Sequence, residues 1–448
     1  MLPFNPLIKK AYFGLAGAGA LYAALMLCLT NVTIQRNALY ANKIVGAWWA
    51  DVDKPQAYGF AKNQVTAFNL TTLDNELLYA WHVLPLNVYE KHESELLEQP
   101  SGSPDGDFTQ TKAFELLAND PDARLVINFH GNAGHVAQGW RTDTYRALTS
   151  QPNTHLVTVD YRGFGRSTGT PTEAGLIADG VALATYALET LRIPSSRIVI
   201  VGQSLGTAVA SAVGLHFADP SASLSLLPNG TASTASPPHA ALSHHYQQHN
   251  PRVDFAAILL IAPFTSLPTL LETYRIFGLV PVLSPVRGYP RFSNYLRAAI
   301  VDTWPTASRI GALVGTVAAS DTTTKRTLRL HVIHAKDDFD IPWTHGQALY
   351  EAASAAVVNQ TSSTAGGEEA KIEDVVVQAD GERTARLRRT AMKTKTAGGG
   401  GGGGGDYARV DVRMDLVPFG GHNRVVTFAP VALAVRRAFD AAAAAGAA

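Results

Sequence analysis

The stretch RIVIVGQSLGTAVASAVGLHFA, residues 197–218, decides the fold of this chain. Its aliphatic start predicts a buried strand, and its small-residue end predicts a helix. Between them lies GQSLG at 202–206, whose two glycines allow a sharp turn where a side chain would collide with the neighbouring strand or helix. Such a turn lifts the hydroxyl of Ser204 clear of the sheet. Ser204 is therefore the candidate nucleophile.

Short aliphatic runs continue on both sides of this stretch, separated by helix-like segments. They occupy residues 124–131, 155–163, 256–263, 328–338 and 410–422. Continuous β-branched runs with intervening helices are typical of a parallel sheet buried on both faces. Residues 64–85 alternate apolar and polar side chains instead, which predicts paired antiparallel strands. We expect one large α/β domain over residues 56–440, with the α/β-hydrolase fold.

Three segments interrupt this domain. Residues 219–252 are rich in Ser, Pro, Ala and His, and residues 362–405 end in an unbroken glycine tract. Both compositions predict disordered inserts that cannot hold a packed core. Residues 264–327, between two core strands, supply many aromatic side chains and predict a helical lid over an apolar substrate. Some of these aromatics are expected to pack the lid on the core instead.

Composition excludes several classes of partner. Lys plus Arg (37) balance Asp plus Glu (37), so no global field draws the chain onto nucleic acid. The one cysteine, Cys28, excludes an intrachain disulfide and a multi-cysteine metal site. Histidines cluster in 219–252 without cysteine or interleaved carboxylate partners, so we expect no metal there. They are His239, His244, His245 and His249.

An apolar segment near the N-terminus predicts a membrane anchor. Residues 11–30 carry no charge over about the length that a helix needs to cross a bilayer core. They separate a short tail, 1–10, from a linker, 31–55. The alternative is a cleaved signal peptide, but its apolar core is usually shorter and is followed by a small-x-small cleavage site. We expect the bilayer to be a partner through residues 11–30.

Charge next to this segment predicts its orientation. Lys9 and Lys10 precede it, and positive charge favours the cytosolic side, so residues 31–448 are expected across the membrane. Glycan-acceptor triplets fit a catalytic domain in the lumen of the endoplasmic reticulum. They start at Asn31, Asn69, Asn229 and Asn359. The chain ends in an alanine-rich tail, 441–448.

A serine nucleophile needs a base and an orienting carboxylate. In this fold the chain order is Ser, acid, His. The acid is expected after the strand that ends near Ala335, where Asp338 is the choice and Asp337 the alternative. His422 is the base, because it follows the last strand on a glycine-flexed loop.

Developing charge on the substrate oxygen needs backbone donors. The amide of Leu205, the residue after the nucleophile, is one, and it brings the positive end of the following helix. The amide of Asn132 is the second, because Gly131 lets the chain turn after the strand at 124–131. Substrate contacts are expected at Gly131, at Gln203 and at Phe264.

Several segments together resemble the family of α/β-hydrolase domain-containing protein twelve and its fungal relatives. They are FHGNAGH at 129–135, DYRGFGRSTGTPTEAG at 160–175, GQSLGTAVA at 202–210, APFTS at 262–266 and HAKDDFDIP at 334–342. The match spans most of residues 60–350. The resemblance implies an integral membrane lipase of monoacylglycerols and lysophospholipids, notably lysophosphatidylserine, with no cofactor. It also implies a triad at Ser204, Asp338 and His422, although Gln203 stands where the family often has histidine.

Three functions remain open at this point. The first is hydrolysis of the carboxylic esters of single-chain lipids taken from the membrane. The second uses the same triad to cleave thioesters on S-acylated proteins, and a catalytic domain in the cytosol would favour it. The third is an inactive hydrolase fold that serves as a membrane scaffold. Intact candidates at Ser204, Asp338 and His422 argue against the third.

Overall fold

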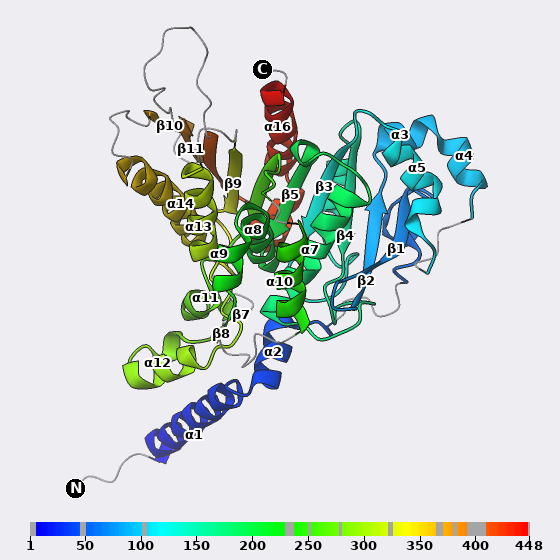
Figure 1. Cartoon of the computed structure of the whole chain (residues 1–448). Helices are drawn as coiled ribbons and strands as arrows, with labels where there is room; N and C mark the ends of the chain where they lie inside the picture. Colours follow the sequence, from blue (N-terminus) through cyan, green and yellow to red (C-terminus); the bar gives the residue numbers. More distant parts are fainter. Residues whose placement is uncertain are drawn as a thin grey trace.

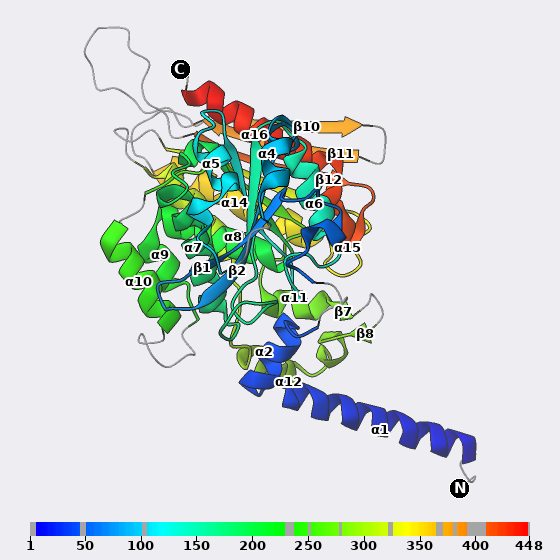
Figure 2. The same cartoon turned by 90° about the vertical axis from the view of Figure 1, so that its right-hand side faces the viewer.

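A central sheet runs through the molecule, and helices lie against both of its faces (Figures 1 and 2). The computed structural model describes residues 6–44, 51–100, 105–228, 237–249, 252–276, 280–320, 326–363, 371–379, 383–391 and 409–446. Helix α1 (Pro6–Cys28) projects away from the rest of this structure in both views. The predicted α/β architecture is confirmed.

Within the described residues the main sheet has ten strands in the order β1-β2-β4-β3-β5-β6-β9-β12-β11-β10. The strands are β1 (Val65–Thr71), β2 (Leu77–Val83), β3 (Arg124–Phe129), β4 (Thr154–Val159), β5 (Ile198–Gln203), β6 (Ala257–Ile261), β9 (Thr327–Ala335), β10 (Lys371–Ala379), β11 (Arg383–Ala391) and β12 (Arg409–Val417). Neighbours from β4 to β12 pair in parallel, and the strands at both ends pair antiparallel. Each aliphatic run predicted as a strand is one, and 64–85 forms the antiparallel pair β1–β2.

Alternate residues of the central strands face opposite helical layers. In β5, Ile198 and Ile200 join one buried cluster, whereas Val199 and Val201 join a second. The first cluster lies against α7 (Glu173–Glu189), α8 (Leu205–Ala218), α13 (Thr306–Ala318) and α14 (Thr344–Ser363), and the second against α6 (Arg141–Thr149) and α16 (Ala429–Gly446). A strand covered on both faces needs apolar residues at every position, which explains the continuous aliphatic runs.

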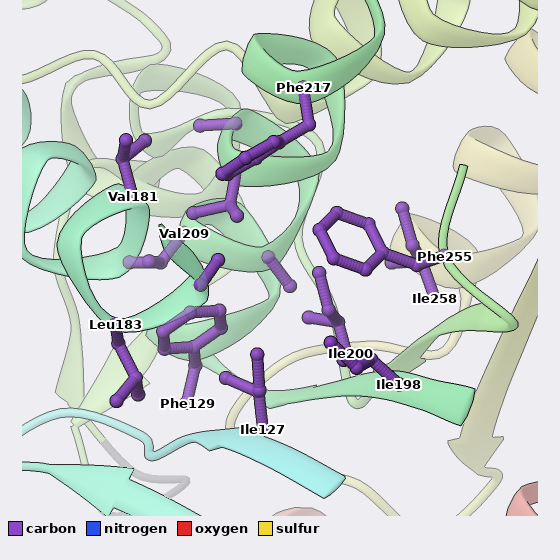
Figure 3. Close-up of a cluster of buried hydrophobic side chains, with 14 of the residues drawn as sticks. Ile127, Phe129, Val181, Leu183, Ile198, Ile200, Val209, Phe217, Phe255 and Ile258 are labelled. Atoms are coloured by element: carbon purple, nitrogen blue, oxygen red, sulfur yellow. The ribbon is translucent and has the colours of Figure 1, made fainter. Parts of the chain in front are cut away.

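Figure 3 shows part of the first cluster, where helices α7 and α8 pack on the sheet. The labelled side chains are Ile127, Phe129, Val181, Leu183, Ile198, Ile200, Val209, Phe217, Phe255 and Ile258. At Gly180 a Cβ would lie 2.7 Å from a methyl of Val213, so a larger residue there would force α7 and α8 apart. This packing fixes α8 behind the turn that carries Ser204.

Shorter elements complete the described chain. They are α2 (Val32–Tyr40), α3 (Leu86–Lys91), α4 (Glu93–Glu98), α5 (Lys112–Ala118), α9 (Pro220–Ser225), α10 (Pro237–His249), α11 (Leu267–Thr273), α12 (Pro290–Ala298), α15 (Gly421–Arg424) and the strand pair β7 (Arg275–Ile276) and β8 (Val280–Pro281). Five 3-10 turns lie at η1 (Pro55–Tyr58), η2 (Phe108–Gln110), η3 (Ser195–Arg197), η4 (Ser284–Val286) and η5 (Val425–Thr427).

Helix α1 is the one helix in the described ranges that is long and apolar enough to cross a membrane. It has 23 residues, and most of its side chains are exposed, including Leu15 and Leu21. A signal sequence passes the same test of length and composition. Helix α2 follows directly, with the side chain of Asn31 capping its first turn.

The segment expected to be a linker, 31–55, differs from that expectation. Helix α2 lies within it, and Tyr40 is fully buried in the core. The expected alanine-rich tail, 441–448, continues helix α16 as far as Gly446, and Ala442 is buried. Tertiary contacts stabilise both helical stretches, and composition alone does not report such contacts.

The two expected disordered inserts contain regular structure. In 219–252, helices α9 and α10 form, and Leu242 of α10 is buried in the first cluster. In 362–405, strands β10 and β11 form a hairpin that extends the sheet beyond β12. Cross-strand hydrogen bonds pair the backbone of residues 371–379 with that of residues 383–391, and such bonds need little apolar surface. The glycine tract, 398–405, lies outside the described residues.

The segment expected to be a lid, 264–327, has two parts. Helix α13 packs against α8 and α14 and belongs to the first helical layer, where Leu313 and Val314 are buried. The preceding part, residues 267–276 and 280–300, holds α11, the β7–β8 pair and α12, and lies beside the end of α1. Of the two parts, only the one that holds α11, the β7–β8 pair and α12 is placed to cover something other than the sheet.

Candidate active site

Ser204 lies at the turn between β5 and α8 and has a positive φ of 51°. A non-glycine residue in this region is strained, at a cost on the order of 1–3 kcal/mol, unless its surroundings hold it. The flanking glycines provide the space. A Cβ at Gly202 would lie 2.3 Å from the carbonyl oxygen of Gly206, and one at Gly206 would lie 2.0 Å from that of Phe129. The sequence therefore folds into the sharp turn that it predicts.

The structure brings Ser204, His422 and Asp338 together in one hydrogen-bonded line. His422 Nε2 lies 2.8 Å from Ser204 Oγ, and His422 Nδ1 lies 2.9 Å from Asp338 Oδ2. His422 lies in the short helix α15 after β12, and Asp338 follows β9. Since β5, β9 and β12 are parallel, their carboxyl ends deliver all three side chains to one edge of the sheet.

Asp338 is buried and fully engaged by hydrogen bonds. Its Oδ1 accepts from the backbone amides of Asp340 (3.0 Å) and Ile341 (2.8 Å). Its Oδ2 accepts from His422 and also lies 3.2 Å from Nε2 of His334, a buried residue that the sequence did not single out. Burial alone would raise the pKa of the Asp338 carboxyl, but the bonds from His334 and His422 outweigh it and hold the pKa well below its usual value.

The neighbouring carboxylate, Asp337, has a different set of partners. It accepts from the backbone amides of Gly420 (3.2 Å) and Gly421 (2.7 Å), immediately before His422. Both glycines have positive φ, so the loop needs their conformational freedom. Asp337 holds the loop that presents His422, whereas Asp338 contacts the imidazole itself.

A pocket of about 590 Å³ opens over Ser204 and His422. The expected site residues Gly131, Asn132, Gln203, Leu205 and Phe264 all line it. Leucines and an aromatic side chain supply much of its apolar wall, at Leu39, Leu267, Leu270, Leu271 and Tyr274. Gln203 donates from Nε2 to the carbonyl of His422 at 3.2 Å, so it also supports the histidine loop.

The loop of Gly131 and Asn132 lies close to Ser204. A Cβ at Gly131 would lie 3.4 Å from the Cβ of Ser204, which leaves room only for a small residue. The side-chain amide of Asn132 donates to the carbonyl of Leu39 in α2, which ties this loop to α2. At the other side, Leu205 is the first residue of α8, where backbone amides have no partner within the helix.

Arg141 stabilises the loop of residues 131–135 by hydrogen bonds to its carbonyls, and it was not predicted from the sequence. Its guanidinium is buried and donates to the carbonyls of Gly131, Asn132 and Ala133, each at 2.8 Å, and to that of His135. A planar fork of donors suits several carbonyls at once. No local pattern marks an arginine that bonds a loop ten residues earlier, so the sequence carried no signal for it.

Among the described residues, no group of three or more His, Cys, Asp or Glu side chains is placed to hold a metal ion. The four histidines of 219–252 lie in α10, where only the side chain of His244 is described, and it is exposed.

Comparison with known proteins points to one group. A model of the alpha/beta hydrolase family matches residues 126–377. The lysophosphatidylserine lipase ABHD12 of Danio rerio is 25% identical over 72% of this chain and 67% of its own length. Protein ABHD12B of Homo sapiens is 30% identical over 53% of this chain and 51% of its own length. Protein bem46 of Schizosaccharomyces pombe is 38% identical over 22% of this chain and 32% of its own length.

Solved structures align with this chain at low similarity. An alpha-beta hydrolase from Vibrio vulnificus aligns with 72% of this chain and 81% of its own, at 13% identity and a TM-score of 0.44. The fold assignment therefore depends on the sheet order of this chain and on the family model.

Proposed function

Because the chain belongs to the alpha/beta hydrolase family and fits its ABHD12-like members, we propose that it is a membrane-anchored serine hydrolase of single-chain lipid esters. The observation that carries this proposal is the hydrogen-bonded line of Ser204, His422 and Asp338, of which Ser204 and His422 line the pocket. This arrangement also argues against an inactive scaffold, which has no chemical reason to keep three groups in register.

Acylation begins at the serine hydroxyl. With the imidazole proton on Nδ1 donated to Asp338, His422 Nε2 accepts the proton of Ser204 Oγ as this oxygen attacks the ester carbonyl. Asp338 remains ionised, stabilises the imidazolium and fixes its orientation. His422 then gives the proton to the leaving alcohol, the ester C–O bond breaks, and the acyl group stays on Ser204.

The oxyanion is stabilised by backbone donors. The amide of Leu205 lies at the positive end of α8, and the amide of Asn132 lies on the loop held by Arg141. Water, deprotonated by His422, then attacks the acyl-enzyme and releases the fatty acid. Each step uses only side chains and amides of this chain together with water, so no cofactor is needed.

The substrate class follows from the relatives and from the pocket. Relatives of this chain are named as lysophosphatidylserine lipases, and the pocket over Ser204 combines an apolar wall with polar groups at Gln138, Asp340 and Asn423. An acyl chain suits the first part and a glycerol or phosphate head group the second. Monoacylglycerols and lysophospholipids have both parts, so we propose them as substrates.

The membrane and compartment belong to the same proposal. Exposed apolar side chains along α1 suit a bilayer, and the cation pair Lys9 and Lys10 favours a cytosolic N-terminus. The catalytic domain then lies in the lumen of the endoplasmic reticulum, next to the leaflet that holds its lipid substrates.

The test is Ser204→Ala in the full chain. The variant should lose fluorophosphonate labelling and lose ester hydrolysis by several powers of ten, since triad residues act as one unit. Thermal unfolding should stay close to that of the wild type, which shows that the fold is intact. Labelling of the alanine variant at the wild-type level would refute Ser204 as the nucleophile.

A further inference from the structure

A second cavity lies beside the pocket over Ser204. It has a volume of about 340 Å³, and Leu39, Leu271 and Tyr274 line both cavities. The second cavity takes no part in the proposed chemistry, because none of Ser204, His422 and Asp338 lines it. Its walls are mostly apolar, with Thr30, Gln35 and Asn132 among the polar residues that line it. The two cavities are therefore neighbours of different character, with shared residues between them.

The end of α1 forms one wall of the second cavity. Met26 and Leu29 line it, and Leu283, Leu296 and Ile300 line it from the segment that includes α12. Met26 is the buried residue of α1 and packs in a small cluster with Leu283 and Leu296. Both views of the structure place α12 beside the base of α1 (Figures 1 and 2).

Polar contacts fix this wall in place. Gln35 of α2 donates to the carbonyl of Ala299 (3.1 Å) and accepts from the amide of Val301 (2.8 Å). Arg36 pairs with the buried carboxylate of Asp302 at 2.9 Å. Removing a charged group from water costs free energy, and an ion pair offsets this cost only when its geometry is good. The pair of Arg36 with the buried Asp302 therefore indicates a defined contact. Helix α2, which follows the end of α1, and residues 299–302 are thus held together as one unit.

We propose that the second cavity is the acyl-chain site, so that the chain runs from the carbonyl at Ser204 past Leu271 and Tyr274 toward the end of α1. This inference rests on the proposed function and adds the location of the chain. A single alkyl chain is the occupant that fits, because the lining is mostly apolar and the cavity adjoins the pocket over Ser204 at one end and the proposed membrane helix at the other. The lipid then reaches Ser204 directly from the bilayer, without exposing its chain to water.

Filling the second cavity tests the proposal. Ile300→Trp places bulk in the wall away from Ser204, and Ala298→Trp is the matched control, since Ala298 is exposed at the end of α12 and lines neither cavity. The readout is kcat/KM for monooleoylglycerol divided by kcat/KM for p-nitrophenyl butyrate. We expect this ratio to fall by about tenfold or more in Ile300→Trp, because a few displaced methylenes suffice for that discrimination. The control ratio should stay at the wild-type value. An unchanged ratio in Ile300→Trp would overturn the proposal.

A second measurement does not depend on how the tryptophan variant folds. An alkylglycerol ether with a diazirine on its terminal carbon cannot be hydrolysed, and on irradiation it reacts with whatever surrounds the chain end. In the wild-type protein and in Ser204→Ala, we expect cross-links within residues 26–41 and 282–300. Cross-links confined to other parts of the catalytic domain would overturn the acyl-chain site. Cross-linking as expected, together with full ester hydrolysis by Ser204→Ala, would instead refute the proposed triad and leave the site standing.

Discussion

Two adjacent carboxylates after the end of β9 have different roles because their side chains contact different groups. Asp338 contacts the imidazole of His422 and is buried, whereas Asp337 accepts backbone amides from the loop before that histidine. Both act on His422, but through different atoms. One orients the ring and stabilises its charge, and the other orders the chain that carries it.

Substituting each aspartate separates these roles. Asp338→Asn should lower kcat by about three to four powers of ten, because an amide cannot stabilise the imidazolium and can hold the wrong tautomer. Asp337→Asn should be far milder, within about tenfold, because its amide oxygen still accepts a backbone hydrogen bond. Steady-state kinetics on p-nitrophenyl butyrate measures both.

Thermal unfolding serves as the control for this pair, and neither variant should unfold at assay temperature. A larger loss in Asp337→Asn than in Asp338→Asn would contradict the assignment of the acid. Equal losses would show that the loop position of His422 matters as much as its charge.

At the scale of elements, the sheet edge beyond β12 is separable from the site. Strand β12 leads to His422 and pairs with β9 over nine residues from Arg409 opposite Thr327, independently of β11. Strands β10 and β11 continue the sheet on the side of β12 that faces away from β9.

Replacing residues 362–405 with a short linker should therefore leave ester hydrolysis within a few-fold of the wild type. The closure entropy of a loop changes slowly with its length, and the β9–β12 pairing remains. Removing the hairpin exposes β12 as an edge strand, so the melting temperature should fall and aggregation should increase. Loss of fluorophosphonate labelling in a folded variant would show that β11 is needed to place His422.

Much of the fold could be predicted, because the spacing of apolar residues and the residue types of a turn can be read from short stretches of sequence. The runs that became β3, β5 and β9 are rich in aliphatic residues, and the glycines around Ser204 predict the turn. By contrast, β10 and β11 carry many charged residues and precede a glycine tract. Their composition therefore predicted disorder, although they pair as strands. Helix α2 was missed because its stability depends on distant contacts such as Arg36 with Asp302.

The site was predictable to the same extent. Ser204, Asp338 and His422 could be named from chain order after successive strands, which requires no knowledge of distances. Arg141 and His334 could not, because each acts on a residue that the fold brings close and no motif surrounds it. The second cavity could not be predicted either, because most of its lining residues lie in two segments, 26–41 and 267–300, that are far apart in the sequence.

At the scale of the whole molecule, burial makes the stability contribution of several carboxyls, Asp160 among them, depend on pH in the opposite sense to that of Asp338. Asp160 follows β4, is fully buried, and its pKa is raised to about 7 by burial, against the amides of Val136 and Arg166 that lower it. A folded pKa above the unfolded value means that the native state binds the proton more tightly. This contribution to stability is complete below pH of about 4 and is lost as the pH rises through about 7.

Asp160→Asn should therefore flatten the fall in the free energy of unfolding between pH of about 4 and about 7. The slope that it removes is at most about 1.4 kcal/mol per pH unit. Chemical denaturation across this range measures it. Asp338→Asn is the control, because the lowered pKa of Asp338 keeps this group ionised in the native state, and its unfolded-state pKa of about 4 leaves it largely ionised above pH of about 5. An unchanged slope in Asp160→Asn would show that its carboxyl stays ionised in the native state.

The orientation of the whole chain across the membrane decides which substrates reach Ser204. The cavity proposed for the acyl chain adjoins the C-terminal end of α1, so the catalytic domain and the leaflet that feeds it lie on the same side. If the cation pair at Lys9 and Lys10 stays in the cytosol, that side is the lumen. Lysolipids and monoacylglycerols of the lumenal leaflet then have direct access, and S-acylated cytosolic proteins have none.

Sealed microsomes test this orientation. External protease should spare the catalytic domain, and a glycosidase should increase its mobility on gels if one of the acceptor triplets is modified. Asn31 caps α2 next to the end of α1, too close to the bilayer for modification, and Asn359 lies within α14. Asn229 lies outside the described residues and is the expected acceptor, so Asn229→Gln should abolish the shift. Digestion of the domain without detergent, and no glycosidase shift in the wild type, would place Ser204 in the cytosol and make thioester cleavage on S-acylated proteins the better hypothesis.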